Sequence, residues 1–244
     1  RYIRYAIDTF TGDGYVLADL VTQEERTQRL PFTQRYVWSP DDTSHFSSLA
    51  SFASFVIGLP LAESEETVVV GALDMRSASW TPDGSVALMS GNNELIVLSA
   101  RTGKVLQRLR TSPEKGERGF GRATLSRDGD KLGFTVNRQD GNVLRVLDIA
   151  TGASRDISPA SGEFYWSPSS EHIALEVPNL EVPHASPRIA VYTFATNRVE
   201  TLSDQSGGYY KFAWAPERDF LAYSEPGEEY EGKFSMRDYE SETA

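Results

Sequence analysis

One short motif recurs along the whole chain, and its regular spacing restricts the fold more than any other feature. Its five copies are VWSPDD (37–42), SWTPDGS (79–85), TLSRDGD (124–130), YWSPSS (165–170) and AWAPER (213–218). The central residues are 42, 45, 41 and 48 residues apart, and four of the five are the only tryptophans of the chain. A period in this range is typical of repeat architectures in which each copy is one structural unit.

The chemistry of the motif predicts a strand that ends in a tight turn. The aromatic residue is expected to end the strand and pack in the core. Proline then fixes φ near −65° at a turn position, and Asp-Gly closes the turn through a side-chain hydrogen bond and a positive φ. The residues expected to fill these structural roles are Trp38, Pro40, Trp80, Pro82, Asp83, Gly84, Trp166, Pro168, Trp214 and Pro216.

The segments between the motifs predict three further strands in each unit. A short apolar strand follows the motif, at 86–90, 131–136, 172–177 and 220–225. An alternating strand comes next and ends in a second tight turn, such as Thr102-Gly103 or Thr151-Gly152, before a last strand such as 105–110 or 198–203. Residues 2–31 can be threaded as the second, third and fourth strands of a further unit. Four strands per unit at this period are typical of a propeller blade.

We therefore predict an all-β chain folded as a β-propeller, with six blades of four antiparallel strands in one domain over residues 1–244. The repeat units are approximately 1–31 (partial), 32–73, 74–117, 118–159, 160–204 and 205–244 (partial). The first blade lacks its opening strand and the last lacks its closing strand. We expect the native chain to continue past Ala244 by about 20 residues to complete the ring. A five-blade ring with terminal extras and a larger ring cut at both ends are the alternatives.

Residues 43–62 form an uncharged stretch long enough to be compared with a membrane span. The stretch contains five serines, a threonine, a histidine and a proline. We therefore predict two strands joined by a tight turn, with no membrane insertion by this segment.

Charge and cysteine content exclude several classes of function. The chain has 24 basic and 35 acidic side chains, a formal net charge of −11, which argues against a nucleic-acid binder. The absence of cysteine excludes disulfide scaffolds, thiolate zinc sites, iron–sulfur clusters and cysteine nucleophiles. Residues 217–244 hold nine acids and three bases, so the acidity is concentrated in the last blade.

No catalytic or cofactor motif stands out in the sequence. There is no G-x-S-x-G, and His45, His172 and His184 lie in different repeats without a partner at metal-ligand spacing. No Ser–His–Asp set is selected by any pattern. The glycines of GERGFG (116–121) lack the strand–helix context of a phosphate loop and are expected to form a connector. We predict no enzyme activity, no cofactor and no metal site.

The predicted topology places the short turns on one face of the disc and the variable connections on the other. The variable connections include 111–121, 178–187, 203–210 and 225–232. Functional contacts concentrate in such loops, and aromatic residues dominate binding hot spots. The loop-rich face is therefore the expected partner-binding surface, with its candidate residues Tyr209, Tyr210, Tyr230, Glu228, Glu229 and Glu231. The glutamates would steer a basic partner.

The five motifs resemble the TolB-like, or PD40 (WD40-like), β-propeller repeat family. The resemblance covers essentially the whole chain and is specific for the repeat. The sequence departs from the family pattern at Leu125, Arg127, Ser169 and Glu217, where we expect looser turns. The same repeat occurs in periplasmic scaffold proteins, in propeller domains of prolyl-oligopeptidase-type serine peptidases and in membrane-anchored extracytoplasmic proteins.

The resemblance and the missing catalytic motifs favour a non-catalytic protein-interaction scaffold, the extracytoplasmic (periplasmic or cell-surface) domain of a membrane-associated or multiprotein assembly. Its expected partner is another protein or a membrane-protein complex. One alternative is the propeller gating domain of a prolyl-oligopeptidase-type peptidase without its catalytic domain. A small-ligand or sugar-binding propeller is the other alternative.

Overall fold

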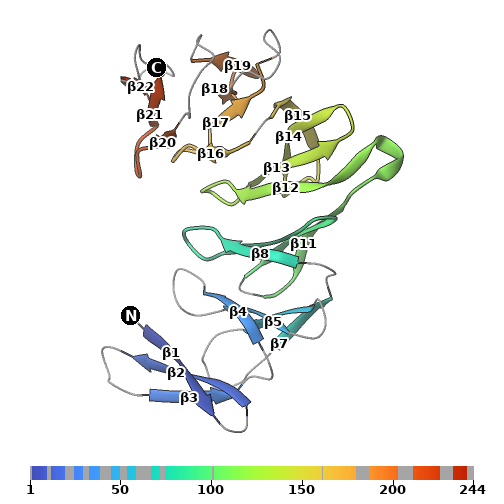
Figure 1. Ribbon diagram of the computed structural model, residues 1–244, viewed down its shortest axis with the longest axis vertical. Helices are drawn as coiled ribbons and strands as arrows, with labels where there is room; N and C mark the ends of the chain where they lie inside the picture. Colours follow the sequence, from blue (N-terminus) through green and yellow to red (C-terminus); the bar gives the residue numbers. More distant parts are fainter. Residues whose placement is uncertain are drawn as a thin grey trace. The chain divides into compact units, whose positions relative to one another are not determined.

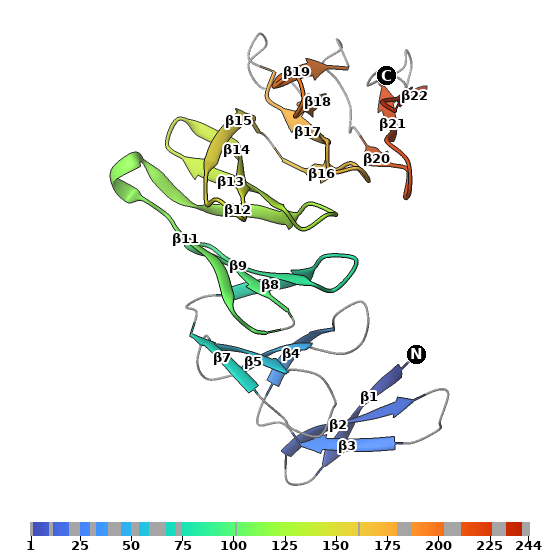
Figure 2. The same ribbon diagram turned by 180° about the vertical axis from the view of Figure 1, so that it is seen from behind.

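A computed structural model describes the strands of the chain and, from residue 75 onward, part of the connections between them (Figures 1 and 2). The described residues are 2–9, 12–19, 25–29, 33–38, 45–49, 54–58, 67–71, 75–100, 102–160, 162–179, 187–202, 211–225 and 233–240, with side chains from residue 77 onward except at 225, 233 and 234. The chain divides into two compact units, Arg1–Arg110 and Thr111–Ala244, which are described separately. The expectation of a single domain stays a prediction.

The first unit contains three antiparallel sheets. The first sheet has the order β1 (Tyr2–Thr9), β2 (Gly12–Asp19), β3 (Glu25–Arg29). The second has the order β4 (Thr33–Trp38), β5 (His45–Leu49), β6 (Ser54–Gly58), β7 (Thr67–Gly71). The third has the order β8 (Met75–Trp80), β9 (Val86–Gly91), β10 (Glu94–Ser99), β11 (Val105–Arg110).

The second unit opens with a short 3-10 helix, η1 (Pro113–Lys115), and also contains three antiparallel sheets. Its first sheet is β12 (Glu117–Leu125), β13 (Lys131–Arg138), β14 (Gly141–Asp148), β15 (Ser154–Pro159). The next is β16 (Phe164–Trp166), β17 (His172–Val177), β18 (Arg188–Thr193), β19 (Arg198–Thr201). The last is β20 (Phe212–Trp214), β21 (Phe220–Glu225), β22 (Lys233–Asp238).

This architecture confirms the predicted fold class. The described strands form six sheets of three, four, four, four, four and three strands, in chain order within each sheet. The uncharged stretch 43–62 supplies β5 and β6, as predicted. No helix among the described residues is long and apolar enough to cross a membrane.

Consecutive sheets of the second unit pack face to face. Between the first two sheets, Val146 and Phe164 belong to one buried apolar cluster. Between the next two, Val191 and Leu221 belong to another. Because side chains alternate across a strand, each sheet contributes one set of residues to the cluster before it and another set to the cluster after it.

Trp166 and Trp214 each join their own sheet to the preceding sheet, by a hydrogen bond as well as by packing. The indole Nε1 of Trp166 donates to the carbonyl of Thr124 over 3.2 Å, and that of Trp214 donates to the carbonyl of Tyr165 over 3.0 Å. Both acceptors lie one residue before the central motif residue of the preceding sheet. The tryptophans therefore set the register between sheets as well as filling the core.

Candidate functional site

The turn that follows the first strand is closed by a buried hydroxyl group paired with a carboxylate. Thr81 Oγ1 donates to Asp83 Oδ1 over 2.6 Å, and Ser126 Oγ donates to Asp128 Oδ1 over 2.5 Å. The backbone N–H five residues after each hydroxyl donates to it, over 3.1 and 2.9 Å. The hydroxyl hydrogen bond lowers the pKa of Asp83. The hydroxyl residue that follows the last residue of the first strand therefore takes part in closing the turn.

The fourth copy of the motif carries Ser169 where the earlier copies carry aspartate, and the next sheet supplies the missing carboxylate. Asp219, in the turn between β20 and β21, accepts hydrogen bonds from Ser169 N (2.9 Å), from Ser167 Oγ (3.1 Å) and from Ser169 Oγ. Asp219 is only 5% exposed. A carboxylate from one blade therefore replaces the motif carboxylate of its neighbour.

His172, the first residue of β17, completes this cluster. It is 3% exposed, and its Nε2 lies 3.7 Å from Asp219 Oδ2. Its Nδ1 lies 3.0 Å from Thr193 Oγ1, and its ring is 5.1 Å from that of Tyr239, centre to centre. The histidine is thus held by contacts on both ring nitrogens and on its face.

The order of these groups differs from that of a catalytic triad. In a triad, histidine lies between serine and aspartate, so that it can take the hydroxyl proton. Here Asp219 lies between the serines and His172, and both serine hydroxyls donate to its carboxylate. This arrangement joins neighbouring sheets. Ser167 Oγ meets His172 through the backbone N–H of the histidine, which donates to it over 3.2 Å.

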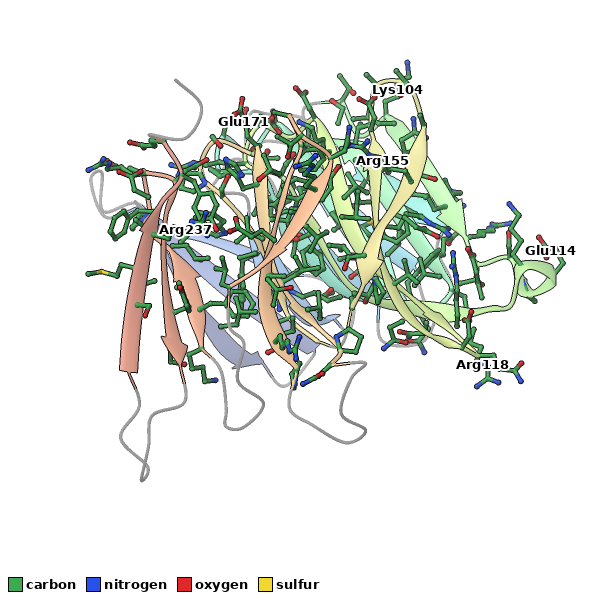
Figure 3. The ribbon with its side chains drawn as sticks, turned by 90° about the horizontal axis from the view of Figure 1, so that it is seen from above. Lys104, Glu114, Arg118, Arg155, Glu171 and Arg237 are labelled. Atoms are coloured by element: carbon green, nitrogen blue, oxygen red, sulfur yellow. The ribbon has the colours of Figure 1, made fainter. Side chains whose placement is uncertain are left out.

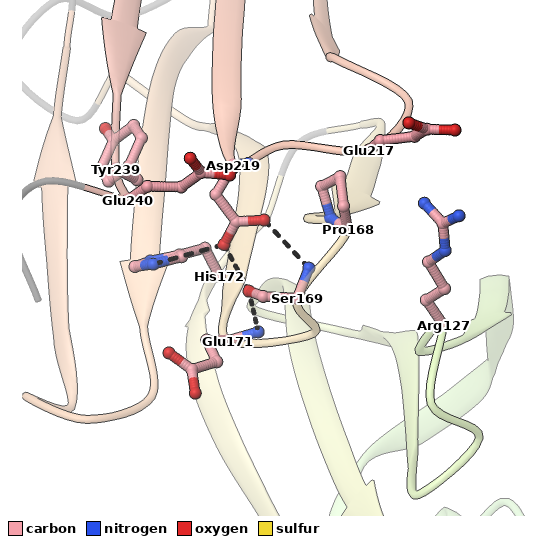
Figure 4. Close-up of a pocket in the computed structure, with 9 residues that line it drawn as sticks. All are labelled: Arg127, Pro168, Ser169, Glu171, His172, Glu217, Asp219, Tyr239 and Glu240. Atoms are coloured by element: carbon pink, nitrogen blue, oxygen red, sulfur yellow. Dashed lines mark hydrogen bonds and ion pairs between the residues drawn. The ribbon is translucent and has the colours of Figure 1, made fainter.

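A cavity of about 330 Å³ opens beside the cluster (Figure 4). Arg127 lies in the turn between β12 and β13, in the fourth sheet along the chain. Its Nη1 donates to the carbonyl of Pro216, between β20 and β21 of the sixth sheet. Four carboxylates and one guanidinium belong to the residues that line it, so the cavity is acidic. The lining residues are Arg127, Pro168, Ser169, Glu171, His172, Glu217, Asp219, Tyr239 and Glu240.

The cavity lies at the end of the sheets where the short turns gather. Figure 3 shows Glu171, in such a turn, and Arg155, near the start of β15, toward one end, and Arg118, at the start of β12, toward the other. The sequence-predicted contact surface uses the opposite connections. Its candidate residues all lie outside the described residues, so that prediction stays open: Tyr209, Tyr210, Glu228, Glu229, Tyr230 and Glu231.

The structure describes most of the repeat residues that the sequence singles out. Each of the four tryptophans ends the first strand of its sheet, and Gly84 has φ of +71°. The side chain of Trp38 and all of Pro40 lie outside the described residues. The sequence signal that was missed is the hydroxyl residue after the tryptophan, which is visible as Thr or Ser in four of the five motifs.

The expectation of looser turns is wrong at Leu125, Arg127 and Ser169. The glycine-position N–H still donates to the hydroxyl residue's carbonyl, over 3.1 Å in the fourth blade and 3.0 Å in the fifth, against 2.9 Å in the third. The fifth turn keeps this bond because Ser170 adopts φ of +65° in place of glycine. In the sixth blade, where Glu217 follows the proline, Phe220 N instead donates to the carbonyl of Arg218 over 2.7 Å.

The described residues contain no group of three or more His, Cys, Asp or Glu side chains that could hold a metal ion.

Comparison with known proteins identifies the fold and nothing finer. No family model and no curated protein matches the chain. The β-propeller domain of the Trilobed protease from Pyrococcus furiosus is 14% identical, with 98% of this chain and 79% of that chain covered and a TM-score of 0.56. Acylaminoacyl peptidase from Pyrococcus horikoshii is 13% identical, with 98% and 43% covered and a TM-score of 0.57.

TolB from Acinetobacter baumannii also matches, at 14% identity over 98% of this chain and 67% of that chain. Its TM-score of 0.48 is too low to support an argument about function. This chain spans less than half the length of the Pyrococcus horikoshii peptidase. At these identities the likeness shows a shared β-propeller fold, as the repeat predicted.

Proposed function

We propose that this propeller is a non-catalytic protein-interaction module. The observation that carries the proposal is the order of groups around Asp219. The carboxylate accepts from Ser167 and Ser169 and faces His172, so the polar groups that could have formed a serine-nucleophile site join two blades instead. A buried and internally satisfied polar network stabilises one conformation and offers no activated nucleophile.

The acidic cavity is the surface proposed for partner binding. Glu171 and Glu217 are exposed on its rim, and Glu240 is partly engaged by Arg218 over 3.1 Å. Exposed carboxylates around a concave site attract a basic side chain and raise the rate of encounter with a positively charged partner. The proposed partner is therefore a protein that presents lysine or arginine to this face.

We place this module outside the cytoplasm, in the periplasm or at the cell surface. The TolB-like repeat supports this location. The alternative function is a gating domain of a serine peptidase. The two Pyrococcus proteins share the fold of this chain, but at 14% and 13% identity that likeness does not favour the alternative over the scaffold.

The proposal is tested by affinity capture from the native extract with the wild-type chain and with the double variant Glu171→Gln/Glu217→Gln. The matched control is Glu114→Gln, which neutralises an exposed glutamate in η1, away from the cavity. We expect the wild type and the control to retain the same basic protein and the double variant to lose it. Capture should weaken as salt rises, because exposed charges are screened. Equal capture by all three chains would contradict the role of the cavity.

A further inference from the structure

Three Asp-Gly pairs lie where the structure describes the side chains, and their carboxylates are held very differently. Two of the pairs belong to the motif turns. Asp83 Oδ1 accepts from Thr81 Oγ1 over 2.6 Å, from Ser85 N over 3.1 Å and from Ser85 Oγ over 2.8 Å. Asp128 Oδ1 accepts from Ser126 Oγ over 2.5 Å. Both carboxylates are therefore fixed in orientation by their own turns.

The motif turns also hold the backbone nitrogen that follows each carboxylate. Gly84 N donates to the carbonyl of Thr81 over 2.9 Å, and Gly129 N donates to the carbonyl of Ser126 over 3.1 Å. These contacts matter because the side-chain carboxyl carbon of an aspartate can react with the backbone nitrogen of the next residue. Glycine at the second position favours this reaction, since no Cβ restricts the backbone. The turns restrain both reacting groups.

The third pair, Asp140-Gly141, has no such restraint. Asp140 is exposed in the turn between β13 and β14, and no hydrogen bond or ion pair among the described residues involves its carboxylate. Gly141 begins β14 with φ of +130°, and a Cβ built on it would meet no atom within 4 Å. It pairs with Arg138 at the end of the two strands, where local opening costs least. The two reacting groups can therefore approach each other.

We propose that Asp140-Gly141 is a site of isoaspartate formation, and that the motif turns protect Asp83-Gly84 and Asp128-Gly129 from the same reaction. The nitrogen of Gly141 forms a bond to Cγ of Asp140, and the carboxyl group loses its hydroxyl oxygen as water. The product is a five-membered succinimide ring.

Water then opens the ring in one of two ways. Cleavage of the bond between the nitrogen and Cγ restores aspartate. Cleavage of the bond between the nitrogen and the backbone carbonyl carbon leaves the chain connected through the side chain, with a free α-carboxylate. One water is released and one is consumed, so no oxidant, reductant or other reactant is needed. The product is a substrate for the class of methyltransferases that esterify isoaspartyl α-carboxylates.

The Thr81 hydroxyl opposes the reaction at Asp83 electrostatically as well as by position. Its hydrogen bond stabilises the ionised carboxylate and lowers the pKa of Asp83. The ring closes from the neutral carboxylic acid, because a hydroxyl group leaves as water far more readily than an oxide does. A lower pKa leaves less of the neutral acid at neutral pH.

The test is incubation of the folded full chain at neutral pH, followed by trypsin digestion and mass spectrometry with electron-transfer fragmentation, which distinguishes isoaspartate from aspartate. Trypsin releases Asp140 in the peptide QDGNVLR (139–145) and Asp83 in the peptide 77–101. We expect isoaspartate to accumulate about tenfold faster or more in 139–145 than in 77–101. Equal accumulation in the two peptides, or none in 139–145, would overturn the proposal.

Two controls separate the effect of the fold from that of the local sequence. In guanidinium chloride both pairs should react at similar rates, because the contacts that hold Asp83 are lost; a difference that persists there would overturn the role of the turn. Thr81→Val removes the hydroxyl and should raise isoaspartate at Asp83 several-fold, whereas Thr81→Ser keeps it and should behave like the wild type. A Thr81→Val chain that is folded by circular dichroism and shows no increase at Asp83 would also overturn that role.

Discussion

Replacement of Asp219 by alanine tests whether this residue substitutes for the motif carboxylate of the fifth blade. The change removes the acceptor of three hydrogen bonds, from Ser169 N, Ser167 Oγ and Ser169 Oγ. Hydrogen bonds to a charged group contribute about 1.5–3 kcal/mol each, and the two hydroxyls can partly compensate by bonding to each other over 3.0 Å. We therefore expect the free energy of unfolding to fall by about 3 kcal/mol.

Ser169→Asp restores the motif carboxylate but places it against the buried carboxylate of Asp219. Like charges at this separation repel, so we expect this single variant to lose about 2 kcal/mol or more. In the double variant Ser169→Asp/Asp219→Ala, the new carboxylate can accept from Ser167, as Asp83 accepts from Thr81. The double variant should lie within about 1 kcal/mol of the wild type, which corresponds to a coupling of about 4 kcal/mol or more.

Urea unfolding at pH 7, followed by tryptophan fluorescence, measures the midpoint and slope for the four chains of this cycle. The reasoning is refuted if the double variant is as unstable as the sum of the two single variants. That result would mean that Asp219 has a role of its own that a carboxylate at position 169 does not replace.

Three further predictions concern the blades. Trp214→Phe should lower the free energy of unfolding by about 1–2 kcal/mol, because the indole hydrogen bond to the Tyr165 carbonyl is lost; an unchanged urea midpoint would contradict this. Gly133→Val should lower it by about 1–3 kcal/mol through a clash with Phe164, read as a lower melting temperature. The pKa of Asp83 is lowered chiefly by the hydroxyl of the motif threonine, so its contribution to stability is complete above the unfolded pKa, near 3.8, and is lost as the pH falls through the lower folded value. Melting temperatures between pH 5 and 2 should fall less in Asp83→Asn than in the wild type.

The fold could be predicted from the sequence because the conformation of each repeat depends mainly on residues that are close together in the chain. Trp80 ends a strand, Gly84 takes a positive φ, and residues 43–62 form two strands, as the spacing and composition predicted. These features depend only on neighbouring residues.

The site was less predictable, because its residues come from different blades. Ser169 and Asp219 are 50 residues apart, and nothing local indicates that one completes the turn of the other. The absence of aspartate at position 169 was visible and suggested a looser turn. The carboxylate that compensates, that of Asp219, comes from the neighbouring sheet, so only the three-dimensional structure shows it. His172 likewise has no partner at a short spacing in the sequence, because the contacts of its ring nitrogens, Asp219 and Thr193, lie 47 and 21 residues further along the chain.

The central claim is that the cluster of Ser167, Ser169, His172 and Asp219 joins blades and does not catalyse. Treatment of the full chain with a fluorophosphonate probe, which labels activated serines, tests this most directly when followed by intact-protein and peptide mass spectrometry. We predict no adduct at Ser167 or Ser169, because both hydroxyls donate to Asp219 and neither is hydrogen-bonded to His172 in a way that would activate it. A stoichiometric adduct on either serine, abolished by His172→Gln, would contradict the claim.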